Sequence, residues 1–226
     1  MRRMVLTATL AVVALALPGC NIVGPIAYLV HGPDKVDKVY TLDESKTTVV
    51  FVDDSNSRLP SRSLRGEIAG AVEKYLLRER CVKDMIEFRS ALQAASVDRS
   101  GSSLSITEIG QQVGAQIVIY VQVDDFGISP DGQSFSPFAK AHVKVMDVKE
   151  GKRVWPPTSD GHPVVLRPQP QPGVTPGTMT ERLEASRLLA NEVGKAVAQL
   201  FYTHELQTAA GSGEIKKADG PYPGPS

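Results

Sequence analysis

The sequence predicts a single α/β domain over residues 47–208, with helices on the faces of a mixed β-sheet of four or five strands. Two observations predict it. Short β-branched and aromatic runs alternate with stretches of helical periodicity in the first half, and strands follow one another directly in the second. Alternation favours parallel strands with crossover helices, whereas consecutive strands form antiparallel hairpins. The expected order is β-α-β-α-α-β-β-β-α, in a three-layer-like arrangement.

The first strand and helix are signalled by a change of period. Residues 47–52 (TTVVFV) form a β-branched run that ends at Asp53 and Asp54, which is typical of a strand followed by a break. After Pro60 the apolar residues recur at helical spacing and predict a helix. They are Leu64, Ile68, Val72, Tyr75 and Leu76.

Two further helices are predicted from capping signals. Cys81–Val82 is expected to form a short strand before them. Asp84 with Glu87, three residues later, predicts a helix that runs to about residue 94, and Ser105 with Glu108 predicts another, because each pair has the spacing of a capping box.

The central strands carry the clearest pattern. Gly114 is placed to end the preceding helix in a left-handed conformation. Residues 116–123 are apolar on both faces for most of their length, as expected of a strand covered on both sides. Residues 139–148 alternate between apolar and polar, which predicts one wet face. Residues 149–152 form a hairpin turn into a strand at 153–155.

The last part of the domain is rich in proline. Residues 156–177 hold seven prolines, with 164–166 as a possible edge strand, and we expect Trp155 to be packed rather than presented. Thr180 is expected to cap a long final helix. Its apolar stripe comprises Leu183, Ala190, Val193, Val197 and Leu200 or Phe201.

The N-terminus reads as a processing signal. Two arginines precede an uncharged apolar run over residues 4–17, too short to span a bilayer comfortably. The stretch Leu17-Pro18-Gly19-Cys20 resembles the lipobox of bacterial lipoproteins. The resemblance implies cleavage before Cys20 and attachment to the membrane by diacylglycerol and acyl chains on that residue. Asn21, by the sorting pattern of such proteins, favours the outer membrane, facing the periplasm, over the inner membrane.

The predicted organisation therefore has four parts. Residues 1–19 are a signal peptide, 20–46 the lipidated cysteine and a tether, 47–208 the periplasmic domain, and 209–226 a disordered tail rich in Gly, Pro, Ser and Lys. Cys81 is the only other cysteine, so no disulfide within the mature chain is available. Without a neighbouring His or Lys, Cys81 is expected to be a buried small hydrophobe.

Two segments of the domain resemble known envelope proteins. Residues 109–115 (IGQQVGA) run directly into a strand, and residues 145–155 (VMDVKEGKRVW) read as a hairpin. This pattern is similar to the periplasmic α/β domain of curli-secretion-type lipoproteins, of the TolB N-terminal domain and of lipoprotein activators of penicillin-binding proteins. The resemblance implies the fold and an envelope location, whereas function varies widely among these families.

Composition and motifs argue against several function classes. The balanced charge, with 25 basic and 25 acidic residues, gives no basic footprint for nucleic acid. The four histidines are scattered without metal-ligand spacing, and neither a nucleophile elbow nor a phosphate or dinucleotide loop is present. We therefore expect a protein that is not an enzyme and has no cofactor.

Two acidic pairs form the one candidate for metal chemistry. Asp53 and Asp54 follow the first strand, and Asp124 and Asp125 follow the central one. If those strands are parallel neighbours, the four carboxylates meet at one sheet edge and offer oxygen ligands to Mg²⁺ or Ca²⁺. The alternative, which we favour, is that they are solvated turn formers and that no metal binds.

A positive row on a late strand forms the candidate interaction face. Lys140, His142 and Lys144 share one side of a late strand, which is a candidate edge strand. Lysines there either prevent aggregation or meet an added strand. We expect an envelope interaction or assembly module that contacts other envelope proteins or copies of itself. One alternative is a subunit of a curli-type outer-membrane secretion complex, and another is a carboxylate-dependent metal enzyme.

Overall fold

The computed structural model describes residues 35–96, 104–129, 134–168 and 176–206. The chain divides into two units, 1–35 and 36–226, and the α/β domain lies in the second. The predicted signal peptide, Cys20, most of the tether, the prolines of 169–175 and the predicted tail fall outside the described residues.

The described elements follow the predicted order, include the possible edge strand at 164–166, and add two short strands, one at each end of the described chain. In chain order they are β1 (Lys35–Val36), β2 (Thr48–Asp53), α3 (Ser63–Arg78), β3 (Met85–Ile86), α4 (Phe88–Ser96), α5 (Ile106–Val113), β4 (Ile117–Gly127), β5 (Phe138–Asp147), β6 (Lys152–Trp155), β7 (His162–Leu166), α6 (Met179–Gln199) and β8 (His204–Glu205).

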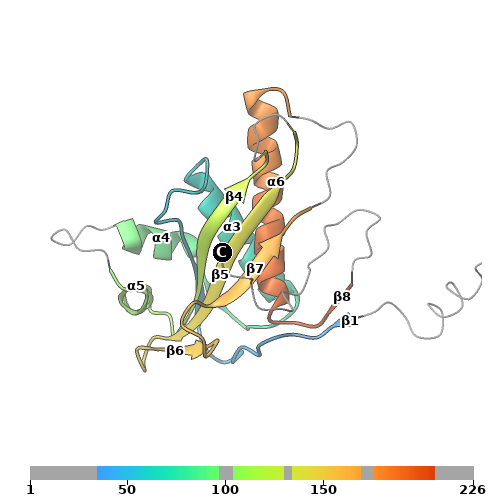
Figure 1. The fold of residues 1–226 in the computed structure, drawn as a ribbon. Helices are drawn as coiled ribbons and strands as arrows, with labels where there is room; N and C mark the ends of the chain where they lie inside the picture. Colours follow the sequence, from blue (N-terminus) through green and yellow to red (C-terminus); the bar gives the residue numbers. More distant parts are fainter. Residues whose placement is uncertain (1–34, 97–103, 130–133, 169–175, 207–226) are drawn as a thin grey trace, which may run out of the picture. The chain divides into compact units, whose positions relative to one another are not determined.

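The main sheet is mixed, as predicted. Its strand order is β3-β2-β4-β5-β6, and β7 also pairs with β5. The strand β2 runs parallel to β3 and β4, whereas β4, β5, β6 and β7 are joined by antiparallel pairings (Figure 1). A separate two-stranded sheet joins β1 and β8. Together with the helices, these pairings confirm the α/β class.

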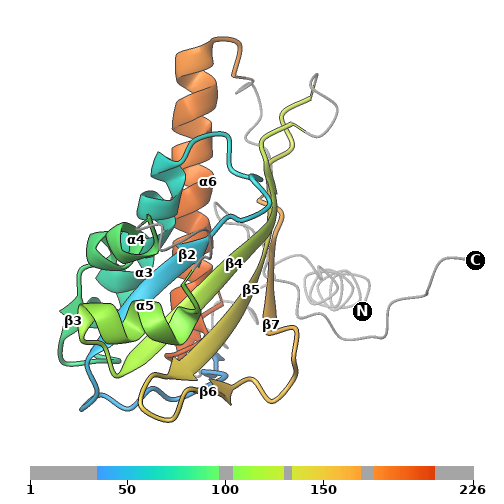
Figure 2. The same ribbon diagram turned by 90° about the vertical axis from the view of Figure 1, so that its left-hand side faces the viewer.

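One face of the sheet is covered by the two long helices, α3 and α6 (Figure 2). Val50 and Val52 of β2 and alternate residues of β4 pack against them in the larger core. The helices approach closely at Gly194, where an added Cβ would lie 2.5 Å from both the Ala71 Cβ and the Ile68 carbonyl oxygen. A side chain at this position would force the helices apart.

The other face carries the two short helices, α4 and α5 (Figure 2). As predicted, Ser105 and Glu108 form the capping box of α5, and Gly114 ends it with a φ of 75°. Gly110 brings α5 down onto the sheet, because its missing Cβ would lie 2.5 Å from Val148 and 2.7 Å from Val118. A second core forms beneath these helices at the beginning of β4.

The segment after α3 differs from the prediction. Val82 enters the core and Cys81 packs against it, so the short strand forms at Met85–Ile86 beside β2 rather than at 81–82. Asp84 does not cap the next helix, because its side chain binds the Met85 N–H. The helix begins at Phe88, whose N–H is bound instead by Glu73 of α3, at 2.6 Å.

The final helix also begins earlier than predicted. Thr178, not Thr180, is its N-cap, and Glu181 completes the capping box. Three threonines lie close together here, and the prediction chose the wrong one. Only Thr178 has a Glu three residues later, which is the spacing that identifies the cap. Leu183 is not part of the buried stripe, since it is 39% exposed. The buried side of the helix starts at Ser186.

A strap formed by residues 39–46 belongs to the packed domain. Leu42 is in the core, and Tyr40 stacks on Trp155 with ring centroids 5.5 Å apart. Lys46 forms an ion pair with Asp147 at 2.7 Å. These residues therefore pack with the sheet and helices, although we had placed them in the tether of 20–46. Trp155 is buried, as predicted.

Across the described ranges, no helix is both long enough and apolar enough to cross a membrane.

Candidate functional site

The half of the sheet that α4 and α5 leave uncovered forms the candidate site, which we call the open face. It comprises Asp53, Gln122, Asp124, Lys140, His142 and Lys144. Tyr120 borders it and is buried at the edge of the second core. The pairing register places these side chains together, because Asp53 lies opposite Gln122 and both Tyr120 and Gln122 lie opposite members of the positive row. The structure thus joins the two groups of residues that the sequence suggested separately.

The sheet extends into this region because β4 is longer than predicted. It continues past Val123 to Gly127, so Asp124 and Asp125 lie within the strand rather than after it. The register with β5 shifts between Val123 and Asp125, which marks a β-bulge at Asp124. A bulge of this kind re-aims a side chain, and here it brings the Asp124 carboxylate to His142.

The contact between His142 and Asp124 is the tightest on the open face. His142 Nδ1 lies 2.5 Å from Asp124 Oδ2, and each side chain is only about one-fifth exposed. That oxygen is buried and receives no hydrogen bond of good geometry, so the interaction is a close polar contact rather than an aligned hydrogen bond. His142 is therefore partly covered, not the freely exposed strand residue that we predicted.

Asp53 and Tyr120 form the second polar pair. The Tyr120 hydroxyl donates to Asp53 Oδ2 at 2.7 Å. Burial, together with this carboxylate, raises the pKa of Tyr120 well above its ordinary value, because both favour the neutral phenol. The Lys144 ammonium lies 5.9 Å from the centroid of the same ring, within the range of a cation–π contact.

The four carboxylates considered for a metal do not converge. Asp54 turns into the following loop, where it accepts the N–H groups of Arg58 and Leu59, and the Asp125 side chain accepts the N–H of Phe126. Over the described residues, no three His, Cys, Asp or Glu side chains gather closely enough to hold a metal ion. Asp54 and Asp125 thus bind neighbouring backbone N–H groups, Asp54 in the loop after β2 and Asp125 within β4.

The positive row does not lie on an edge strand. The strand β5 is flanked by β4 on one side and by β6 and β7 on the other, so a partner cannot add a strand beside Lys140, His142 and Lys144. The outer neighbour over most of this row is β7, in which Pro163 has no N–H to offer. A partner must therefore contact the side chains of the open face.

The remaining sequence candidates lie elsewhere. The His162 ring packs against Trp155 at a tilt, and burial, with a smaller effect of His142, lowers the pKa of His162. Cys81 is half-buried against the core, and burial raises the pKa of its thiol, which opposes a reactive thiolate. His204 contacts Tyr202, and His31 falls outside the described residues.

Sequence reasoning missed Tyr120 and Gln122. The sequence contains the pattern that would have identified them. Tyr120, Gln122 and Asp124 occupy every second position, and each has a polar group. A period of two marks one face of a strand. We predicted that the strand is covered on both faces for most of its length, which holds only for its first half.

Comparisons with known proteins give only a weak likeness. No family model matches the sequence, and no curated protein matches it. Among solved structures, the fold is similar to the PelC dodecamer protein of Paraburkholderia phytofirmans (10% identity, 75% of this chain and 96% of that chain, TM-score 0.42). It is also similar to the hypothetical protein CT253 of Chlamydia trachomatis (14%, 67% and 93%, 0.41) and to the lipoprotein GNA1162 of Neisseria meningitidis (13%, 66% and 99%, 0.38). At these scores the likeness carries no argument about function.

Proposed function

We propose that this chain is a lipid-anchored cell-envelope protein whose α/β domain binds another envelope protein, or a second copy of itself, through the open face. Its role is recognition or assembly rather than catalysis. The anchoring part is supported by Cys20, which directly follows a positive start, an apolar run and a glycine. That arrangement is typical of a lipidated exported protein.

The observation that carries the interaction is the mixed charge of the open face on a rigid support. Asp53 and Asp124 lie on one side and Lys140 and Lys144 on the other. Neither lysine forms an ion pair with any described residue, so both are available to a partner. Complementary charge patterns of this kind set the register and specificity of an interface more than its affinity.

Metabolic labelling with radioactive palmitate tests the anchor. We expect the parent chain to carry label and to fractionate with membranes, preferentially the outer membrane, and Cys20→Ala to lose both label and membrane association, because acyl chains supply the anchoring energy. An unlabelled parent chain, or a parent chain recovered in the soluble fraction, would contradict the proposal.

In-cell cross-linking tests the interaction. A short amine-reactive cross-linker, followed by mass spectrometry, should join Lys140 or Lys144 to one partner in the envelope. The double variant Lys140→Ala/Lys144→Ala should lose that product. The matched control Lys152→Ala removes an exposed lysine of β6 that pairs with Glu150, and it should keep the product. Absence of a specific product from the parent chain would rule out the proposed interaction.

A further inference from the structure

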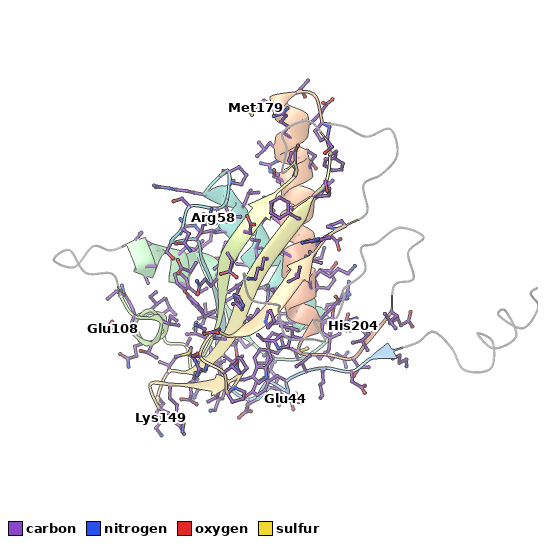
Figure 3. The ribbon with its side chains drawn as sticks, viewed as in Figure 1. Glu44, Arg58, Glu108, Lys149, Met179 and His204 are labelled. Carbon is purple, nitrogen blue, oxygen red and sulfur yellow. The ribbon has the colours of Figure 1, made fainter. Side chains whose placement is uncertain are left out.

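A hollow lies at the end of the domain where the strap, the end of α3 and the end of α6 meet. Its volume is about 350 Å³, and its lining includes Lys38, Glu44, Glu79, Arg80, Cys81 and Tyr202. Figure 3 labels Glu44, which lines the hollow, and the neighbouring His204. Both lie at the end of the domain opposite Met179, the first residue of α6. The size suits a small ligand or the headgroup of a larger one.

The unpaired charges of this hollow are positive. Glu79 is neutralised by Arg78, whose guanidinium lies 2.8 Å away, and Glu44 lies 3.8 Å from Lys83. Lys38 and Arg80 are also among the lining residues, and neither forms an ion pair with a described residue. An anion is therefore the ligand that the hollow favours. Arg80 in particular can present two parallel N–H donors to a phosphate.

Arg80 occupies a strained position. Its φ is +55°, in the left-handed region, and it follows the end of α3, a place where glycine is usual. An arginine in this conformation is strained, because its Cβ lies close to a backbone carbonyl oxygen. Strained residues cluster at functional sites, so an arginine kept in a conformation better suited to glycine points to a role for its side chain.

The same end of the domain is close, along the chain, to the proposed anchor. Fifteen residues separate Cys20 from Val36 in the sequence, so the proposed anchor precedes the strap by a short stretch of chain. Val39 in the strap, Leu77 in the last turn of α3 and Leu206 after β8 are each nearly half exposed. Exposed apolar residues beside basic ones are typical of a surface that contacts the bilayer interface.

We propose that this hollow binds the phosphate of an anionic lipid headgroup, held by Lys38 and Arg80, and so orients the domain on the membrane that anchors it. The proposal rests on the proposed lipid anchoring and adds to it a headgroup site within the domain. Tyr202 also lines the hollow, and burial raises its pKa to about 12. Like any tyrosine it is protonated at neutral pH, so its hydroxyl can donate a hydrogen bond to the phosphate.

Vesicle co-sedimentation tests the site without the acyl anchor. The full chain carrying Cys20→Ser is mixed with vesicles of 30% phosphatidylglycerol in phosphatidylcholine, and with vesicles of phosphatidylcholine alone. Binding to the neutral vesicles measures every contact that does not depend on anionic lipid. We expect several-fold stronger binding to the anionic vesicles at low salt. A competition arm with inorganic phosphate separates a phosphate site, where it competes, from one that needs the whole lipid, where it does not.

Two variants and a matched control make the test specific. In the Cys20→Ser chain, Arg80→Gly should relieve the backbone strain, so the protein should fold at least as well, yet bind the anionic vesicles about fivefold more weakly. Lys38→Ala should weaken binding by a similar factor, as expected for the loss of one basic residue near the surface. Lys149→Ala removes an exposed lysine at the turn before β6, outside the hollow, and should leave binding unchanged.

Three outcomes would overturn the proposal: equal binding to the two kinds of vesicle, undiminished binding by Arg80→Gly, or an equal loss on Lys149→Ala. Because the Cys20→Ser chain carries no lipid, these outcomes are independent of palmitate labelling. A failure of the headgroup site is thus distinguishable from a failure of the anchor.

Discussion

The two faces of the sheet are covered by helices of different length. On one face lie α3 and α6, of 16 and 21 residues, and on the other α4 and α5, of 9 and 8 residues. At 1.5 Å per residue the first pair measures about 24 and 31 Å and the second about 13 and 12 Å. The 11 residues of β4 extend over about 36 Å.

This difference in length separates a face that stabilises the fold from the open face, through which we propose that the domain binds. The long helices cover their face along most of the strands and bury a continuous apolar core. The short helices cover Val49 and Phe51 of β2, the beginning of β4 and the end of β5. Beyond them, the residues of β4 and β5 on this face are polar and partly exposed. We call the face covered by α3 and α6 the closed face. Substitutions on the closed face should therefore change folding, and substitutions on the open face should change the proposed binding.

The largest effect is expected where the closed face is tightest. Gly194→Ala places a methyl group 2.5 Å from the Ile68 carbonyl oxygen, and backbone cannot move aside as a side chain can. We expect a loss of about 3 kcal/mol in the free energy of unfolding, measured by urea denaturation. The control Gly70→Ala meets only the Phe88 ring, at 3.4 Å, and should be neutral or stabilising by up to about 1 kcal/mol. Equal effects would mean that the helices are not in close contact.

A smaller loss is expected from the matching glycine on the half-covered face. Gly110→Ala meets the methyl groups of Val148 and Val118, and α5 is a short helix that can shift. We expect a loss of about 1.5 kcal/mol by the same measurement. If this variant proved less stable than Gly194→Ala, the contrast between the faces would be reversed.

The attachment of α4 to α3 should depend on pH. Burial raises the pKa of Glu73 from 4.5 to about 7, with Glu87 and Arg89 nearby as smaller influences. Between these pH values the folded carboxyl keeps a proton that the unfolded one has lost, so its contribution to stability falls as pH rises through this window. Glu73→Gln stays neutral and still offers an acceptor to the Phe88 N–H.

For Glu73→Gln we therefore expect no change in the free energy of unfolding near pH 4.5 and a gain of about 1 kcal/mol at pH 8, since the group is half in water and the effect is screened. Urea denaturation at both pH values measures it. The exposed neighbour Glu87 provides the control, and Glu87→Gln should show no such pH dependence. A gain that is equal at both pH values would exclude ionisation as its cause.

The smallest effect on stability is expected on the open face. Lys140→Ala/Lys144→Ala should change the free energy of unfolding by no more than about 0.5 kcal/mol, because neither side chain forms an ion pair. Thermal denaturation, carried out beside the cross-linking assay, measures it. A large loss of stability would make these lysines structural and remove the distinction between the faces.

Local signals predicted most of the fold. The capping box at Ser105, the left-handed Gly114 and the alternation of β5 each depend on residues close in sequence, and the structure confirms them. The predictions at Asp84 and Thr180 were wrong because tertiary contact or a competing cap decided the helix start. The Phe88 N–H, for example, is bound by Glu73, 15 residues away.

The open face was predicted only in pieces. Lys140, His142 and Lys144 could be placed on one side of a strand by their period, but that the strand is internal depends on β7, which crosses back beside it. The approach of Asp124 to His142 depends on a bulge. A one-residue register shift between strands leaves no mark in the composition, so sequence alone could not bring the two groups together.

The strap has a mechanical consequence for a domain attached through its N-terminal side. The N–H groups of Val39 and Tyr40 bind the Leu200 carbonyl oxygen at 2.8 and 3.0 Å, and Lys46 is paired with Asp147 across the sheet. Tension from that side must break these contacts before it reaches β2. The contacts of the strap therefore bear such a pull first and protect the central strands from it.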